Sequence, residues 1–203
     1  MRRILLLVLG RENMYKRLTI EDKVRVPPQH FGEDVEESVK AGLESEVEGT
    51  INSEIGVVIA VEEVDSIEGG DIEPEDAGIH YKVEYTALVY EPELHEVVNG
   101  EVVDITEFGA FIRIGPFDGL CHVSQVMDDY VNYDEENAML VSDEAENTLE
   151  VGDNVVTRII AVSLDKKDTN KVNLTMRQPG LGKQEWIEKY EEEQAEAEEA
   201  EAE

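Results

Sequence analysis

The chain has 203 residues, of which 41% are hydrophobic, so it can build folded cores and is not a wholly disordered protein. Its 49 Asp and Glu residues outnumber 17 Lys and Arg residues, which gives a formal net charge of −32. Salt screens such self-repulsion, so acid spread along the whole chain favours a cytoplasm of very high salt. A mesophilic acidic protein with a charged tail is the alternative. The single cysteine, Cys121, excludes an intramolecular disulfide.

Residues 1–13 precede the first regular pattern. Their apolar run, Ile4 to Leu9, is shorter than the roughly seven residues that a signal peptide needs. It is also far too short to span a bilayer. We expect the native chain to start at Met14, which makes residues 1–13 a start-site artefact or a disordered extension. A cytoplasmic protein is expected.

Residues 14–92 predict an α+β domain, because strand-like alternation surrounds one amphipathic helical pattern. In that helix Val35, Val39, Leu43 and Val47 recur at every fourth position. The order strand, helix, strand, strand is typical of a small sheet covered by one helix. The expected elements are a strand over 14–26, a helix over 33–49, strands over 54–65 and 80–90, and a loop over 66–78.

Residues 93–180 predict an all-β domain, since five short strands in this length are typical of a five-stranded OB barrel. A polar insertion over 128–150 separates the third strand from the fourth. A short helix over 181–190 carries the only tryptophan, and residues 191–203, nearly all Glu and Ala, predict an acidic disordered tail. The expected strands are 96–105, 108–114, 117–123, 154–164 and 171–176.

Phe108, Phe111 and His122 are spaced to share one face of this barrel. Exposed aromatic rings can stack on the bases of single-stranded nucleic acid. The spacing alone leaves two interpretations open for the phenylalanines, a stacking platform or core positions, and His122 can equally be an ordinary exposed edge residue.

Basic residues are scarce, so their placement is informative. Lys166 and Lys167 fall in the loop between the last two strands, a loop that OB barrels use to bind oligonucleotides, and we expect them to contact phosphate. Lys171 follows that loop, and it can bind RNA or only solvate the surface. A second group of basic residues lies on the first predicted strand, and it can bind either RNA or an acidic protein partner. Its members are Lys16, Arg17, Lys23 and Arg25.

Enzyme chemistry has no support in the sequence. It contains no glycine-rich phosphate loop, serine elbow or metal motif, and its histidines are scattered. Pairs of carboxylates do not indicate an active site here, because so acidic a chain contains many such pairs by chance. We therefore expect no catalytic residue, no metal and no cofactor.

The segment Gly100-x-Val-x-x-Ile-x-x-Phe-Gly-Ala-Phe111, followed by Gly119-Leu-x-His-Val-Ser124, resembles the RNA-binding domain first described in ribosomal protein S1. The resemblance covers roughly residues 96–178. It implies that Phe108, Phe111 and His122 bind single-stranded RNA with nearby basic residues such as Arg113. Asp104 and Asp118 depart from the pattern of a strongly basic binder.

The first half adds a second resemblance. The opening segment 14–28, the single helix and the Gly-Val-Val-Ile-Ala-Val strand are together similar to the larger stalk subunits of archaeal DNA-dependent RNA polymerase, relatives of the seventh subunit of eukaryotic polymerase II. This resemblance implies a truncated ribonucleoprotein-like domain that docks on the polymerase core. It also implies a smaller helical partner subunit, contact with nascent RNA, and roles in promoter opening and processivity.

An RNA-binding subunit of a translation initiation or exosome complex is the alternative, because such proteins carry the same barrel. That alternative requires a different N-terminal domain.

Overall fold

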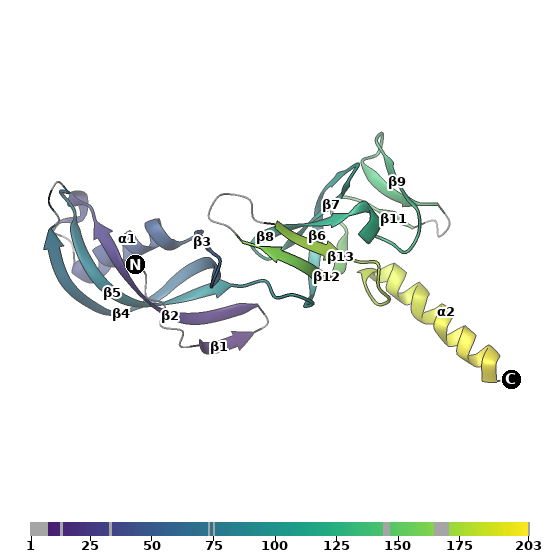
Figure 1. The fold of residues 1–203 in the computed structure, drawn as a ribbon, viewed down its shortest axis with the longest axis horizontal. Coiled ribbons are helices and arrows are strands. Elements are labelled where there is room, and N and C mark those ends of the chain that lie inside the picture. The colour runs from purple at the N-terminus through teal and green to yellow at the C-terminus, as the bar shows by residue number, and fades with distance from the viewer. Residues whose placement is uncertain are drawn as a thin grey trace. The chain divides into compact units, whose positions relative to one another are not determined.

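The computed structural model describes residues 8–12, 14–32, 34–72, 74, 76–143, 147–164 and 171–202. The chain forms two compact units, and the main division falls between Glu91 and Pro92. Figure 1 shows the first unit as a curved sheet with one helix, and the second as a barrel with a small additional sheet and a C-terminal helix. Among the helices of the described residues, none is long and apolar enough to cross a membrane.

The first unit is built on a five-stranded antiparallel sheet in the order β1-β2-β5-β4-β3. Its long central strands, β2 and β5, pair from Tyr15 opposite Tyr90 to Val26 opposite Ile79. Their many β-branched and aromatic residues suit a pleated, half-buried surface. The strands are β1 (Val8–Glu12), β2 (Tyr15–Val26), β3 (Ile51–Asn52), β4 (Gly56–Ile72) and β5 (Ile79–Tyr90).

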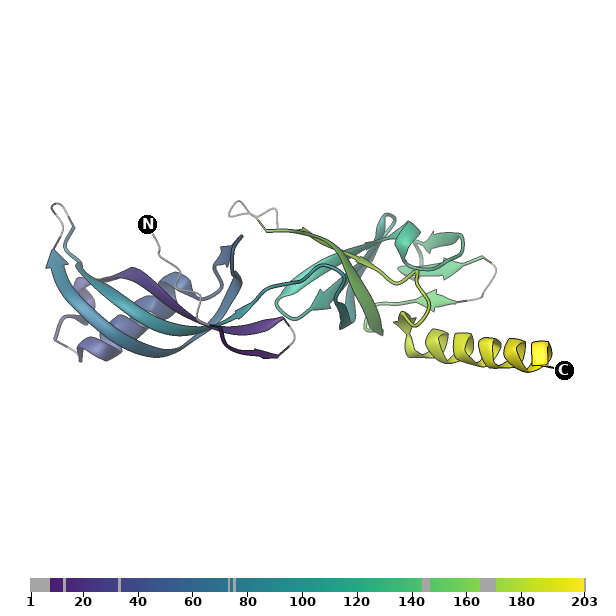
Figure 2. The ribbon, with the colours of Figure 1, turned by 60° about the horizontal axis from the view of Figure 1, so that its bottom comes forward.

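Helix α1 (Val35–Val47) lies across one face of this sheet, as Figures 1 and 2 show, after a short 3-10 helix η1 (Pro28–His30). The carboxylate of Asp34 caps the helix by accepting the Glu36 amide N–H at 2.9 Å. Three residues of the predicted apolar stripe, Val39, Leu43 and Val47, are buried. Val35, the first residue of the helix, is 47% exposed and is not part of the core cluster beneath the helix.

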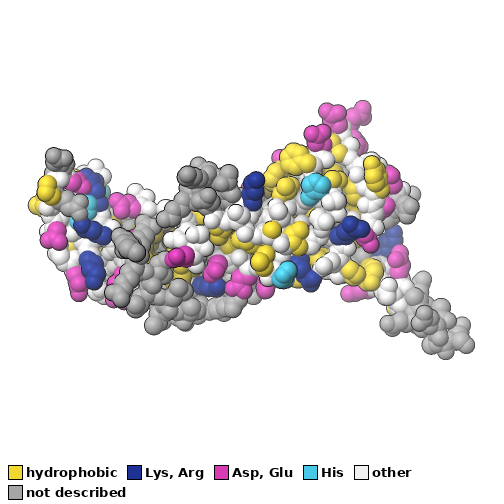
Figure 3. Space-filling model, in the orientation of Figure 1, with side chains coloured by type: hydrophobic (Ala, Val, Ile, Leu, Met, Phe, Trp, Pro, Cys, Tyr) yellow, Lys and Arg dark blue, Asp and Glu magenta, His cyan; other side chains and the backbone are white. Residues whose placement is uncertain are grey.

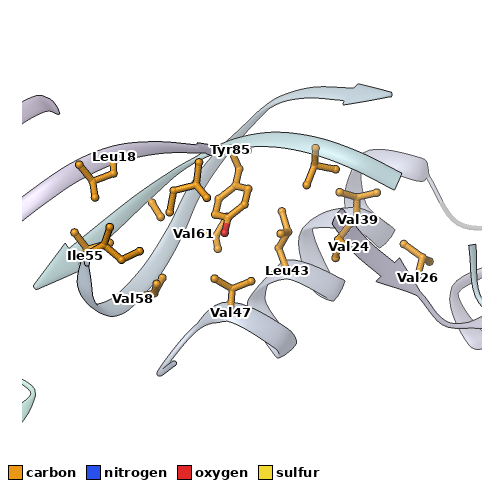
Figure 4. Close-up of a cluster of buried hydrophobic side chains, with 14 residues drawn as sticks. Leu18, Val24, Val26, Val39, Leu43, Val47, Ile55, Val58, Val61 and Tyr85 are labelled. Atoms are coloured by element: carbon orange, nitrogen blue, oxygen red, sulfur yellow. The ribbon is translucent and has the colours of Figure 1, made fainter. Parts of the chain in front are cut away.

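The core of this unit lies between α1 and the sheet, with side chains from β2, β4 and β5 directed toward the helix (Figure 4). Each buried Val, Leu or Ile side chain stabilises the fold by about 1.5–3 kcal/mol. The cluster comprises Leu18, Ile20, Val24, Val26, Val39, Leu43, Val47, Ile55, Val58, Val61, Val83, Tyr85, Ala87 and Val89.

Two segments of the first unit differ from the sequence prediction. The expected loop over 66–78 is wrong in its first half, because β4 continues to Ile72 and pairs with β5 through several bulges. Backbone hydrogen bonds do not depend on apolar side chains, and Gly69 and Gly70 supply the positive φ angles that the bulged strand adopts. Within residues 1–13, Val8–Glu12 forms β1 against β2. A native start at Met14 stays a prediction.

The second unit contains a closed five-stranded barrel. β6, β7 and β8 form an antiparallel meander, β12 pairs with β6 and β13, and β13 closes the barrel by pairing in parallel with β8. This is the OB-type barrel that the sequence predicts. The strands are β6 (Val97–Thr106), β7 (Gly109–Ile114), β8 (Phe117–His122), β12 (Asn154–Ser163) and β13 (Lys171–Thr175).

Further elements are added to the barrel. A 3-10 helix η2 (Val123–Gln125) follows β8, and the predicted polar insertion folds into a small antiparallel sheet of β9 (Val131–Asp134), β10 (Met139–Ser142) and β11 (Thr148–Leu149). After β14 (Gly182–Lys183), helix α2 (Gln184–Ala202) continues through the segment predicted as a short helix and a disordered tail. The helix begins at Gln184, and its residue Trp186 packs on Gly182. Glu and Ala have high helix propensity, and they extend the helix beyond that contact.

Candidate nucleic-acid interface

Strand alternation separates the barrel core from an outward surface on β7 and β8. Ala110, Ile112 and Ile114 are buried, so the residues between them on β7, Phe111 and Arg113, point outward. The same alternation on β8 buries Phe117, Gly119 and Cys121. The outward surface, hereafter the aromatic face, consists of Phe108, Phe111, Arg113, Asp118, Leu120 and His122.

The register of β7 against β8 orders this surface into rows. Gly109 lies opposite His122, Phe111 opposite Leu120, and Arg113 opposite Asp118. Consecutive rows lie two residues apart along the strand, or about 6.8 Å. The sequence-predicted residues Phe108, Phe111, Arg113 and His122 are therefore neighbours on one surface.

Phe108 and Phe111 form an edge-to-face pair, with ring centroids 6.0 Å apart and ring planes at 89°. Phe108 is 46% exposed, and Phe111 is partly exposed. Neither ring is a core residue, so the geometry favours the surface interpretation over the core interpretation. Phe117 is the phenylalanine of this region that packs inside the barrel, at 7% exposure.

Gly109 fixes the position of Phe108. Its φ of 147° lies in a region that favours glycine, and an added Cβ would lie 2.2 Å from the carbonyl oxygen of Cys121. The backbone carbonyl of Phe108 accepts a hydrogen bond from the Val123 N–H at 2.9 Å. The Thr106 hydroxyl donates to the carbonyl of Gly109 at 3.1 Å. Phe108 is thus held at the rim of β7 by its backbone while its ring stays exposed.

His122 is exposed at the end of β8. Its Nδ1 accepts the backbone N–H of Ser124 at 3.3 Å and lies 2.9 Å from the Ser124 hydroxyl. Because Nδ1 accepts, the proton of the neutral ring is on Nε2. The ring therefore offers a donor at its outer nitrogen, which a phosphate or base oxygen can accept.

Positive charge on the aromatic face is compensated. The Arg113 guanidinium pairs with Asp118, with Nε 2.9 Å from Oδ1, and this ion pair raises the pKa of Arg113. Lys171 is exposed on β13, the strand beside β8. Lys166 and Lys167 lie outside the described residues. Figure 3 likewise shows hydrophobic, basic and acidic side chains interspersed on the second unit, with a histidine beside hydrophobic side chains.

Asn173 is a neighbour of this surface that the sequence analysis missed. It is exposed and lies opposite Leu120 across the parallel β8–β13 pairing. Period-two alternation from Lys171 along β13 was the signal that could have found it. Its carboxamide can donate to and accept from a base edge.

The second basic group, at β2, is divided between the two faces of the sheet. Arg17, Lys23 and Arg25 occupy odd-numbered positions and therefore lie on one face of the sheet. Lys16 lies on the opposite face and is only 15% exposed. Most of the group is paired with acid. The pairs are Lys16–Glu91 at 2.7 Å, Arg17–Glu62 at 3.0 Å and Arg25–Asp76 at 2.7 Å.

Asp76 organises a small polar network in the first unit. Its carboxylate accepts from the Arg25 guanidinium, from the Gly78 N–H at 2.9 Å and from Nε2 of His80 at 2.9 Å. The hydrogen bond from Arg25 is the largest cause that lowers the pKa of Asp76, followed by those from Gly78 and His80. The network ties the segment before β5 to β2.

No group of three or more His, Cys, Asp or Glu side chains within the described ranges is arranged to hold a metal ion. The surface geometry instead consists of aromatic rings, a guanidinium, an imidazole and a carboxamide. Such groups bind by stacking and hydrogen bonding.

The fold and this surface define a two-unit protein with an S1-type barrel. The model of the S1 RNA binding domain matches residues 91–177. The model described as "SHS2 domain found in N terminus of Rpb7p/Rpc25p/MJ0397" matches residues 21–77. The predicted fold class of both halves is thereby confirmed. A translation or exosome subunit would require a different N-terminal domain, and the N-terminal match does not fit that alternative.

Whole-chain relatives identify the family. The chain is 36% identical over 174 residues to "DNA-directed RNA polymerase subunit Rpo7" of Sulfolobus acidocaldarius, covering 86% of this chain and 95% of that protein. It is 35% identical to the protein of the same name from Saccharolobus shibatae, covering 86% and 97%. It is 25% identical to "DNA-directed RNA polymerase II subunit rpb7" of Dictyostelium discoideum, covering 83% and 98%.

The chain therefore belongs to the Rpo7/Rpb7 family of RNA polymerase subunits. In this family it is an accessory subunit of a nucleotidyltransferase and supplies no catalytic residues of its own.

Proposed function

We propose that this chain is the larger stalk subunit of an archaeal RNA polymerase and holds nascent single-stranded RNA on its aromatic face. The observation that carries the proposal is the pair of the exposed Phe108 ring and the partly exposed Phe111 ring on an S1-type barrel, in a chain of the Rpo7/Rpb7 family. RNA bases stack on the two rings. Arg113, His122, Lys171 and the loop residues Lys166 and Lys167 contact bases or phosphates. By holding the transcript, the subunit supports promoter opening and processive transcription in the cytoplasm.

The stacking role has a direct test. Phe108 and Phe111 are both changed to Ala in the full chain, and binding to a labelled single-stranded RNA is measured in molar KCl. At that salt the phosphate contribution is weak, whereas stacking on aromatic residues contributes about 1–3 kcal/mol per base, or roughly 5- to 150-fold in affinity. Phe31→Ala is a matched control, because Phe31 is 45% exposed and lies in the first unit. If the double variant keeps the wild-type affinity, the stacking role is wrong.

The first unit docks on the polymerase core and, with a smaller helical subunit, completes the stalk. The exposed cationic face of β2 supports this part of the proposal, because Arg17 is 58% exposed in its ion pair and Lys23 is exposed. Lys16 and Arg25 form ion pairs with Glu91 and Asp76 within the first unit. Co-purification of core subunits with Arg17→Glu/Lys23→Glu should fall well below the wild-type yield. Lys189→Glu, a charge reversal on exposed α2, is the control.

The native source is proposed to be a halophile. Support comes from the net charge of −32, which is carried throughout the chain and not only by α2. Folding should then require salt, because screening shortens to about 3 Å at 1 M and removes most of the self-repulsion. A folded, monodisperse protein in 10 mM salt would contradict this proposal.

A further inference from the structure

The Arg113–Asp118 ion pair continues the line of aromatic rings along β7. Arg113 lies two residues after Phe111 on the same strand, and therefore on the same outward face. Asp118 faces Arg113 directly across the β7–β8 ladder. The side chains are 58% and 46% exposed, so the pair is on the surface beside the rings and not beneath them.

The contact between the two side chains is two-pronged. Nε of Arg113 lies 2.9 Å from Oδ1 of Asp118, and Nη2 lies 3.4 Å from Oδ2. A carboxylate bound along one edge of a guanidinium limits rotation of the planar group and leaves its flat surfaces free. Guanidinium planes stack on nucleic-acid bases much as aromatic rings do. Asp118 also cancels the charge of Arg113 locally, which weakens Arg113 as a phosphate ligand.

We propose that Asp118 is a positioning residue that holds the Arg113 guanidinium as a third stacking surface, in line with Phe108 and Phe111. This inference rests on the proposed function, and it extends the site by one base. It gives the acidic Asp118 a positive role on a surface where a carboxylate would otherwise only repel RNA.

The rival interpretation is electrostatic, and it predicts the opposite sign. If Asp118 merely repels phosphate, its removal tightens RNA binding, and most strongly at low salt. If Asp118 orients Arg113, its removal weakens binding, and the loss persists in molar KCl.

Glu101 provides the matched control for this test. It is exposed on β6 and lies opposite Arg113 across the β6–β7 pairing, so it is the other carboxylate that flanks the same guanidinium. No hydrogen bond between Glu101 and Arg113 is present among the described residues. Glu101→Ala and Asp118→Ala therefore change the net charge equally, but only the second removes the bond that orients the guanidinium.

The experiment measures binding of full-length variants to single-stranded RNAs of increasing length, in molar and in 0.1 M KCl. We expect Asp118→Ala and Arg113→Lys each to weaken binding roughly 3- to 10-fold in molar KCl. Affinity should rise with RNA length until the site is full, and we expect each variant to reach that plateau with an RNA one nucleotide shorter than wild type. The double variant should be no weaker than either single variant, because both changes remove the same surface. Glu101→Ala should bind within about twofold of wild type or more tightly.

The salt dependence separates stacking from phosphate contact. Each phosphate contact with a single strand contributes a slope of about −0.7 in log affinity against log salt. Arg113→Ala should leave the slope unchanged if the guanidinium stacks. A slope that becomes shallower by about 0.7 shows that Arg113 binds phosphate and overturns the inference.

The outcomes also distinguish this inference from the proposed function. If Asp118→Ala tightens binding as much as Glu101→Ala does, while Phe108→Ala/Phe111→Ala still weakens it, only the positioning role fails. If wild type binds no RNA, the proposed function itself fails. Fluorescence of Trp186 reports whether Asp118→Ala is folded, and Arg113→Lys tests the same surface if it is not.

Discussion

Changing Gly109 to Ala should damage both the barrel and its aromatic face. The backbone at Gly109 has a φ of 147°, and an added Cβ would lie 2.2 Å from the carbonyl oxygen of Cys121 and 2.9 Å from Cα of His122. Both partners are backbone atoms of β8, so no side chain can rotate away. The strands must move apart at the row in which Gly109 lies opposite His122, directly beside Phe108.

Gly152 supplies the reference for the size of this effect. Its φ of 95° also disfavours a side chain, but among the described residues nothing lies within 4 Å of an added Cβ. Gly152→Ala should therefore cost only the backbone strain, about 1–2 kcal/mol. Gly109→Ala adds an overpacking cost of about 1–3 kcal/mol, for a total of about 2–5 kcal/mol. The difference between the variants isolates the close approach of β7 to β8.

Urea unfolding at constant molar KCl measures that difference. Trp186 is the only tryptophan of the chain and packs on Gly182 in the second unit, so its fluorescence reports this unit. Gly109→Ala should unfold at clearly lower urea than Gly152→Ala, and it should also bind RNA more weakly. Equal midpoints for the two variants would refute the argument that backbone contact requires glycine at 109.

Two further substitutions and one labelling experiment have expected outcomes. Leu43→Ala, in the fully buried core between α1 and the sheet, should destabilise the first unit by about 2–5 kcal/mol in denaturant titrations. Asp76→Asn should destabilise the same unit at pH 7. Because the folded pKa of Asp76 is lowered, its contribution is complete above the unfolded pKa of about 4 and is lost as the pH falls below it. The wild-type and Asp76→Asn unfolding curves should therefore converge in acid. Burial raises the pKa of Cys121 to about 12, so this thiol should resist alkylation at pH 8 until the barrel unfolds, and rapid labelling of native protein would contradict its burial.

The sequence predicted the fold well where periodicity and turns coincide. Alternation in 108–114 and 117–123 predicts strands there, and the structure has β7 and β8 at these positions. The predicted helix over 33–49 became α1 because an apolar stripe and a capping aspartate agree on its position. Composition was the weaker guide. It predicted a loop where β4 continues and a disordered tail where α2 continues. Polar residues can also form strands and helices, because the hydrogen bonds of these elements are made by the backbone and not by apolar side chains.

The candidate site was predictable only in part. Spacing located Phe108, Phe111 and His122, but it could not decide whether the rings lie inside or outside the barrel. That decision comes from the β7–β8 register, a long-range property that places His122 opposite Gly109. The same register reveals the Arg113–Asp118 pair and the position of Asn173 beside Leu120. From sequence alone Asp118 was only an unfavourable charge.

An acidic protein can bind RNA if attraction to phosphate is not the main driving force. On the aromatic face, the Arg113 charge is neutralised by Asp118, and the exposed rings of Phe108 and Phe111 remain as contact area. Stacking depends little on salt, whereas the repulsion of phosphate by distant carboxylates disappears beyond about 3 Å at 1 M salt. Affinity for single-stranded RNA should therefore rise or stay constant as KCl increases from 0.1 M to 1 M, opposite to the behaviour of a basic RNA-binding domain. A steep loss of affinity over that range would show that Lys166, Lys167 and Lys171 dominate binding, and that the rings do not.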